Sequence, residues 1–367
     1  MVNRGDILCL ELRNVVKRFP GVSAVDHVSL KVAQGMVFSL LGPSGCGKTT
    51  ALRLVAGLET LDEGDILIDD KVINDIPPFK RDCSMVFQNL ALFPHMTVEG
   101  NIAYGLERRK IPETEIRKSI GELLDLMGLG GLEKRRPSQL SGGQRQRVAL
   151  ARSLVLKPKI LLLDEPLASL DRKLRKEMQV ELKRIQREVG ITFLYVTHDQ
   201  KVALSISDII AVMRNGTLEQ IGTPNEIYET PKTRFIADFM GASNIFSGRL
   251  LSKSDRKFQL ETESGLIISA PEDKSIRSEE ITGISVHPEL INVLSIDTDM
   301  KGDNKFRGRI IEMAYQGDFI ETKISLKQTG ELITAHVNSR LDQKNQISPN
   351  DEVLVHWNWH SSNILFG

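Results

Sequence analysis

The sequence is poor in cysteine. Cys9, Cys46 and Cys83 are the three cysteines among 367 residues, and they are widely separated. This argues against a disulfide framework and against a cysteine-based zinc site, because both need a denser and more regular set. Cys46 is most simply a small residue tolerated in its loop. The low cysteine content indicates a reduced compartment, and we expect a cytoplasmic location.

Long hydrophobic runs are also lacking. No stretch approaches 18 uninterrupted apolar residues, and the run 160–163 is cut short by Asp164. A bilayer-spanning helix needs about 20 such residues. Residues 1–6 turn polar at once, so we expect no secretory signal. We therefore expect that the chain does not cross a membrane by itself and that it associates with a membrane only through partners.

The chain has no excess of either charge. It holds 48 Lys plus Arg and 48 Asp plus Glu, for a net charge of zero. Overall charge therefore gives no support to nucleic-acid or anionic-lipid binding, and we expect no nucleic-acid partner. A hydrophobic content of 41% with 26% charged residues is typical of a globular protein, and the length allows two or three domains.

Against this background, one motif carries chemistry. Residues 36–41 form an apolar strand-like run, and a glycine-rich loop and a helix-compatible segment follow it. The pattern G-x-x-x-x-G-K-[ST] turns backbone N–H groups toward polyphosphate, while its lysine reaches the β and γ phosphates. An ordinary glycine-rich turn is the alternative, but the flanking strand and helix favour nucleoside triphosphate binding. The expected nucleotide-binding residues are Gly42, Pro43, Ser44, Gly45, Cys46, Gly47, Lys48, Thr49 and Thr50.

The chain changes character along its length. Apolar strand-like runs alternate with helical patterns up to about residue 240, which predicts a mostly parallel α/β sheet. Residues 97–151 are mainly helical in pattern. After residue 241 short alternating segments separated by turns predict a small all-β barrel or sandwich. We expect an α/β domain over 1–240, with a helical subdomain at about 89–151, and a β domain over 241–367.

A pair of carboxylates ends a second buried strand. Residues 160–163 are apolar, and Asp164 and Glu165 follow them. In isolation such a pair is often a helix cap or a surface turn. Beside a phosphate loop, Asp164 fits the acid that organises Mg²⁺, and Glu165 is placed to polarise the attacking water as general base.

Residues 140–144, Leu-Ser-Gly-Gly-Gln, precede a helical pattern and form a second anion site. Two such sites suit two copies of the chain that face each other, each completing the other's Lys48 pocket. Between the two earlier motifs, this string resembles the signature of the ATP-binding cassette (ABC) family. The resemblance extends from about Leu8 to Gly241. The signature residues expected to contact nucleotide are Ser141, Gly142, Gly143 and Gln144.

The resemblance implies further roles. His198 follows the strand pattern 193–197 and matches the switch histidine, which contacts the γ-phosphate and works with Glu165, although a lone histidine is more often structural. Gln88 matches the residue that senses Mg²⁺ and marks the contact with the membrane partner. Phe19 matches the aromatic platform for adenine. Thr49, Gln88 and Asp164 would form the metal site, with ATP and Mg²⁺ as cofactors.

The C-terminal segment indicates which branch of the ABC family the chain resembles. It looks like the OB-like, TOBE-type regulatory domain of bacterial importer ATPases, with residues 287–289 and 315–317 similar to recurring elements. Residues 174–193, 213–216 and 219–224 closely resemble spermidine/putrescine importer ATPases. This implies a P-loop NTPase fold with a RecA-like core, an antiparallel β subdomain and a helical subdomain. It further implies a homodimer, two permease subunits and a substrate-binding protein at the cytoplasmic face of the inner membrane.

Some positions depart from the family pattern. Ala168-Ser169 exchanges the usual Ser-Ala order, Lys201-Val202 replaces a Glu-Glu pair, and Gly100 stands where an acid is common. These positions bear on partners more than on ATP chemistry. Importers of ferric iron, sulfate, phosphonate or sugars therefore remain alternatives. A soluble regulatory ABC ATPase is another, although the C-terminal segment has few of the basic–aromatic clusters that oligonucleotide binding requires.

Overall fold

The computed structural model describes residues 7–241, 244–254, 257–272, 281–296, 298, 302–338 and 347–366. Contacts within the backbone divide the chain into two units, Met1–Pro224 and Asn225–Gly367. The division falls earlier than the boundary expected near residue 240. Two short helices after Pro224 group with the β-strands that follow them, and each was too short to give a helical period in the sequence.

A six-stranded sheet forms the centre of the first unit. Its strand order is β10-β9-β3-β8-β7-β6, and all neighbours are parallel except β9 and β10. Every residue of β3, β7 and β8 is buried, as expected for parallel strands covered on both faces. The strands are β3 (Val37–Leu41), β6 (Cys83–Val86), β7 (Ile160–Asp164), β8 (Thr192–Thr197), β9 (Ile209–Arg214) and β10 (Thr217–Gly222).

A second, antiparallel sheet has the order β2-β1-β4-β5. It packs with helix α1 (Lys48–Ala56) against one face of the central sheet. The helix-compatible segment after the glycine-rich loop is thus a helix, and Gly57 ends it in the left-handed conformation (φ 76°). The strands of this sheet are β1 (Leu8–Phe19), β2 (Val22–Ala33), β4 (Glu63–Ile68) and β5 (Lys71–Val72).

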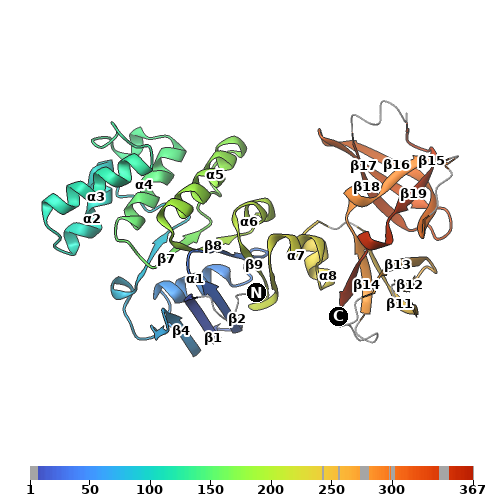
Figure 1. Ribbon diagram of the computed structural model, residues 1–367, viewed down its shortest axis with the longest axis horizontal. Coiled ribbons are helices and arrows are strands. Elements are labelled where there is room, and N and C mark those ends of the chain that lie inside the picture. Colours follow the sequence, from blue (N-terminus) through green and yellow to red (C-terminus); the bar gives the residue numbers. More distant parts are fainter. Residues whose placement is uncertain are drawn as a thin grey trace. The chain divides into compact units, whose positions relative to one another are not determined.

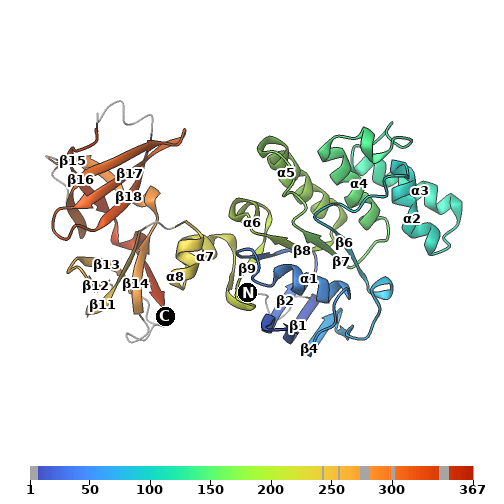
Figure 2. The same ribbon diagram turned by 180° about the vertical axis from the view of Figure 1, so that it is seen from behind.

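The other face of the central sheet is covered by helices. Figures 1 and 2 show α2, α3 and α4 gathered at one end of this unit, with α5 and α6 beside them. The pattern 97–151 is therefore helical, as predicted. The helices are α2 (Val98–Arg108), α3 (Glu113–Leu126), α4 (Gly142–Leu154), α5 (Arg172–Val189) and α6 (Gln200–Ile206).

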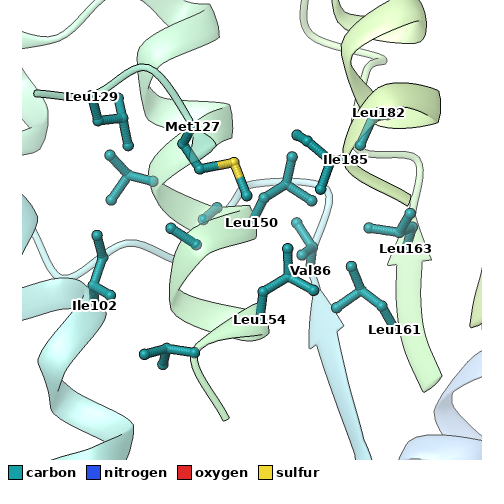
Figure 3. Close-up of a cluster of buried hydrophobic side chains, with 14 of the residues drawn as sticks. Val86, Ile102, Met127, Leu129, Leu150, Leu154, Leu161, Leu163, Leu182 and Ile185 are labelled. Carbon is teal, nitrogen blue, oxygen red and sulfur yellow. The ribbon is translucent and has the colours of Figure 1, made fainter. Parts of the chain in front are cut away.

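Alternate residues of the central strands point to opposite faces of the sheet and pack into two different hydrophobic cores. Leu161 and Leu163 of β7 face the cluster that includes α4 and α5, whereas Ile160 and Leu162 face the cluster with α1. Figure 3 shows Leu154 of α4 near Val86 and Leu161, with other side chains of α4 and α5 around them. Helix α4 is thereby fixed against the sheet as well as against α2. Among the described residues, no helix is long and apolar enough to cross a bilayer.

The second unit contains two five-stranded antiparallel sheets, as the alternating patterns predict. Their orders are β13-β12-β11-β14-β20 and β15-β19-β16-β17-β18. One core lies between them, with Trp357 fully buried near Phe246 and Phe306. Trp359 lies outside the strands, in a 3₁₀ turn, Trp359–Ser361.

Helices α7 (Pro224–Glu229) and α8 (Arg234–Phe239) precede these sheets, and Ala237 of α8 packs on Leu365 of β20. The strands are β11 (Asn244–Ser254), β12 (Lys257–Thr262), β13 (Ile267–Pro271), β14 (Ile281–Val286), β15 (Asn292–Ser295), β16 (Asn304–Tyr315), β17 (Phe319–Leu326), β18 (Leu332–Asn338), β19 (Glu352–Trp357) and β20 (Asn363–Phe366).

Candidate nucleotide-binding and hydrolysis site

The glycine-rich loop lies between β3 and α1 and fits tightly against its neighbours. Gly47 precedes α1 with φ 104°, and a Cβ there would lie 2.0 Å from the Ala24 carbonyl oxygen. At Gly42 a Cβ would lie 2.3 Å from the Met213 carbonyl oxygen. Only glycine satisfies both demands, because any side chain would clash with backbone. These two glycines seat the loop between β2 and the end of β9.

Lys48 is buried at the start of α1, and its side chain turns back over the loop. The Nζ atom donates hydrogen bonds to the carbonyl oxygens of Gly42 and Pro43, both at 2.8 Å. Cys46 Sγ lies 3.6 Å from the same nitrogen. The ammonium group is therefore held at the loop itself, where a bound polyphosphate would meet the backbone N–H groups.

A hydroxyl in the first turn of α1 meets a carboxylate at the end of β7. Thr49 Oγ1 donates to Asp164 Oδ1 at 3.0 Å, although 115 positions separate the residues. Burial raises the pKa of the Asp164 carboxyl, and the hydrogen bond from Thr49 opposes that rise. A carboxylate whose charge is penalised by burial gains from a nearby cation.

Glu165 stands at the centre of a side-chain network. Its Oε1 lies 2.8 Å from His198 Nδ1, and its Oε2 accepts a bond from Gln88 Nε2 at 3.3 Å. The backbone of Glu165 has φ 45°, in the left-handed region that residues other than glycine adopt at an energetic cost. Its backbone N–H donates to the Val196 carbonyl at 3.0 Å and holds that turn in place.

The contact with Glu165 indicates which ring nitrogen of His198 carries the proton. An ionised Glu165 can only accept, so Nδ1 of the ring is the donor in this pair. A neutral ring then presents Nε2 as an acceptor. To donate to a phosphate from Nε2, the ring must either carry a second proton or release Glu165.

Phe19 lies at the end of β1, in the hairpin whose second strand carries Ala24 beside Gly47. Its ring is 42% exposed, and Lys17 Nζ lies 5.2 Å from the ring centroid. An exposed aromatic face in this hairpin can stack on a planar base.

The signature residues form a separate helix start. Ser141 caps α4, since its Oγ accepts from Gln144 N at 3.3 Å while Gln144 Oε1 accepts from Ser141 N at 2.9 Å. Gly143 packs closely on α5, where a Cβ would lie 3.0 Å from Leu174. Among the hydrogen bonds of the described residues, none joins this group to the phosphate loop. The structure thus brings together Lys48, Thr49, Gln88, Asp164, Glu165 and His198, but not Ser141–Gln144.

Two arginines that the sequence did not single out hold the loops of this site. Arg175 of α5 donates to Asp199 Oδ2 and to the Leu170 carbonyl oxygen, both at 3.0 Å. It thereby ties the loop at 168–171 to the residue after His198. Arg152 of α4 donates to two carbonyls just after Gln88. The sequence gives little indication of this supporting role, because an arginine on a helix is usually exposed to solvent.

Known protein families match both parts of the chain. A family model described as "ABC transporter" matches residues 25–168, and one described as "TOBE domain" matches residues 284–362. The "Spermidine/putrescine import ATP-binding protein PotA" of Rubrobacter xylanophilus is 43% identical over 99% of this chain and 95% of its own length. The protein of the same name from Thermobifida fusca is 47% identical, over 94% of this chain and 89% of its own length.

The chain belongs to this family of ABC ATPases. Solved ABC structures match the first unit. The cbiO1 protein of Clostridium perfringens, described as part of the transporter complex cbiONQ, has a TM-score of 0.57 and 31% identity over 61% of this chain and 91% of that one. A dimeric cassette in a post-hydrolysis state bound to ADP and phosphate has a TM-score of 0.52 and 32% identity over 59% of this chain and 98% of that one. The ABC fold with a TOBE domain, expected from the sequence, is confirmed.

Proposed function

We propose that this chain is the ATP-hydrolysing subunit of a bacterial importer of polyamines such as spermidine and putrescine. It works as a homodimer on two permease subunits fed by a substrate-binding protein, at the cytoplasmic face of the inner membrane. The observation that carries the ATPase assignment is Glu165, held between Gln88 and His198 beside the phosphate loop. The polyamine assignment is supported by the full-length similarity to proteins named for spermidine/putrescine import.

The residues have distinct roles in this proposal. Lys48 and the backbone N–H groups of residues 44–50 bind the β and γ phosphates, and Phe19 stacks on adenine. Glu165 accepts a proton from the attacking water as the water approaches the γ-phosphorus atom. His198 and Gln88 orient the Glu165 carboxylate through the two hydrogen bonds described above.

The oxygen atoms around Asp164 suit Mg²⁺. Thr49 supplies a hydroxyl beside a largely buried carboxylate, and Mg²⁺ in nucleotide sites is held by few protein oxygens together with phosphates and water. Bound there with ATP, the ion would neutralise phosphate charge. Thr49, Asp164 and Gln88 are the residues proposed to hold it. The cation would also offset the penalty that burial places on the Asp164 carboxylate.

The dimer completes the site. Ser141 and the start of α4 form an anion-binding helix N-terminus that belongs, in this proposal, to the nucleotide held by the partner's Lys48. ATP then bridges two half-sites, and hydrolysis removes the bridge. The γ-phosphate forms this bridge. ATP binding therefore favours the closed pair of chains, and loss of the γ-phosphate favours the open pair.

The test combines transport with hydrolysis. A strain lacking the chain is complemented with wild type or with Glu165→Gln, and uptake of labelled spermidine, putrescine, sulfate, ferric iron, a phosphonate and a sugar is measured. Wild type should restore polyamine uptake alone, and the variant should restore none. Restored uptake of another solute would refute the polyamine assignment but keep the importer. If the purified chain has no ATPase activity in the presence of its copurifying permeases, the assignment of ATPase activity is refuted.

A further inference from the structure

The segment just after Gln88 has an unusual backbone. Leu90 and Ala91 adopt φ 62° and φ 44°, so two successive residues with side chains occupy the left-handed region. Such residues rarely adopt this conformation, because Cβ approaches the following carbonyl oxygen. Two in a row persist only where the surroundings hold them. The conformation of this loop therefore depends on contacts made from outside it.

Arg152 of α4 supplies such contacts. Its Nη1 donates to the Ala91 carbonyl oxygen at 2.6 Å, and its Nη2 donates to the Leu90 carbonyl oxygen at 2.9 Å. The guanidinium carbon lies 5.3 Å from the ring centroid of Phe93. A planar fork with two parallel donors fits two neighbouring carbonyls, whereas a lysine ammonium offers a single point of contact. The arginine thus binds both left-handed residues at once.

The far end of the segment is fixed separately. Asn101 of α2 is fully buried, its Oδ1 accepts from Phe93 N at 2.8 Å, and its Nδ2 donates to the Phe93 and Thr97 carbonyl oxygens. Leu90 and Leu92 pack against the core shared by α4 and the central sheet. The loop is therefore anchored by α2 at one end and by Arg152 at the other, nearer Gln88.

Arg152 also connects two parts of the machinery. It lies near the end of α4, the helix that Ser141 caps at its start. Burial lowers the pKa of Arg152, but the usual value is high enough for the side chain to stay charged. A charged donor in a partly buried site makes stronger hydrogen bonds than a neutral one. Arg152 thus links the end of α4 directly to the backbone two residues beyond Gln88.

We infer that Arg152 is a positioning residue, which holds Leu90 and Ala91 in the left-handed conformation and so keeps Gln88 on Glu165. Through the same two bonds, it joins the Gln88 loop to the signature helix α4. The inference rests on the proposed role of Gln88 and Glu165 in hydrolysis. The arginine touches neither nucleotide nor the reacting atoms in this account, and it acts only through the loop.

The experiment compares variants of the full-length chain. Arg152→Met removes both bonds, Arg152→Lys keeps the charge without the fork, and Ala91→Gly removes part of the left-handed cost. Arg147→Met is the matched control, since Arg147 lies on the same helix but donates to the Met127 carbonyl oxygen. Measured quantities are kcat and KM for ATP, amide hydrogen exchange of residues 88–93, and the melting temperature of each variant.

Arg152→Met should lower kcat at least about tenfold with KM within about twofold, because a misplaced catalytic geometry costs rate more than binding. Exchange at 88–93 should rise. Adding Ala91→Gly to Arg152→Met should recover part of kcat, whereas Ala91→Gly alone and Arg147→Met should stay within about twofold of wild type. A kcat loss that glycine does not recover would overturn the conformational account, since loss of general stability predicts no rescue.

Unchanged exchange and unchanged kcat in Arg152→Met would overturn the inference outright. If that variant does not fold, Arg152→Lys provides the same test with a smaller expected loss of kcat. Wild-type kcat and wild-type exchange in Arg152→Lys would then count equally against the role given to the two guanidinium hydrogen bonds. Gln88→Ala separates the two proposals. Full turnover in Gln88→Ala would refute the role given to Gln88, while exchange at 88–93 in the Arg152 variants would still report on the clamp.

Discussion

The Glu165 carboxylate lies 2.8 Å from Nδ1 of His198, although the two residues are 33 positions apart and end different strands. They meet because β7 and β8 are parallel neighbours, so the residues after their carboxyl ends emerge at the same edge of the sheet. Gln88 reaches the same carboxylate from the end of β6, the strand on the other side of β7. One strand order thus assembles the three side chains.

Replacing Glu165 tests the general base. Glu165→Gln keeps an oxygen that can accept from His198, but it cannot take a proton from water. We expect the ATPase rate to fall by about 10²–10⁴-fold. ATP should remain bound, and the chain should run as a dimer in size-exclusion chromatography with ATP. Glu107→Gln, on the exposed face of α2, serves as control. A variant that stays monomeric with ATP would count against Glu165 as the base.

Replacing Lys48 tests the phosphate loop. Lys48→Ala removes the ammonium held on the Gly42 and Pro43 carbonyls, which we propose as the charge that binds the β and γ phosphates. We expect ATP to bind at least about tenfold more weakly in isothermal titration. Lys80→Ala, which removes an exposed lysine from a 3₁₀ turn, should change affinity by less than about twofold. Equal ATP affinity in Lys48→Ala and wild type would refute this reading of the loop.

The sequence indicates candidate residues for the chemistry more readily than the residues that support them. Lys48, Asp164, Glu165 and Ser141 were identifiable because each stands in a short motif whose residue types are dictated by phosphate, metal or water. The apolar runs that became β3, β7 and β8 identified the parallel sheet for the same reason, since burial on both faces demands continuous hydrophobicity. These signals are local in the chain.

The supporting contacts are not local. Arg152 donates to carbonyls about 60 positions earlier, and Arg175 reaches Asp199 across 24 positions. The two bonds of Arg152 go to backbone carbonyls, which place no demand on the residue type at the acceptor, so they leave no pattern in the sequence. Leu90 and Ala91 adopt a conformation that their residue types disfavour, which no propensity argument could anticipate. Helices α7 and α8 have six residues each, fewer than two turns.

Two glycines of the phosphate loop should differ sharply in their tolerance to substitution. A Cβ at Gly47 would overlap the Ala24 carbonyl at 2.0 Å, whereas at Gly45 (φ 80°) nothing lies within 4 Å. Gly45→Ala should therefore cost only the left-handed penalty, about 1–2 kcal/mol. Gly47→Ala adds a clash with backbone and should cost at least about 2 kcal/mol more. Urea unfolding of the two variants measures the difference. Equal losses would mean that β2 moves away at little cost.

The ion pair between Glu181 and Arg184 predicts a pH-dependent stability. Hydrogen bonding to Arg184, on the same helix, lowers the pKa of Glu181, and burial opposes this effect. Arg184 also donates to the Leu126 carbonyl oxygen at 2.7 Å, so the pair helps fix α5 on the end of α3. A carboxyl whose pKa is lower in the folded state stabilises the fold above its unfolded pKa, near 4.5. That contribution is lost as pH falls through the folded value.

Glu181→Gln should therefore destabilise the chain at pH 7 by up to about 1 kcal/mol, as for a half-exposed pair. The difference from wild type should begin to shrink below about pH 4.5, where Glu181 of the unfolded chain becomes protonated, and it should be lost as pH falls through the lower pKa of the folded state. Glu177→Gln, an exposed position on the same helix, controls for the loss of one negative charge. Urea unfolding of the three proteins, from pH 7 down to the lowest pH at which the fold persists, checks the sign. A Glu181→Gln penalty that stays constant down to the lowest pH would show that the pair acts through shape rather than charge.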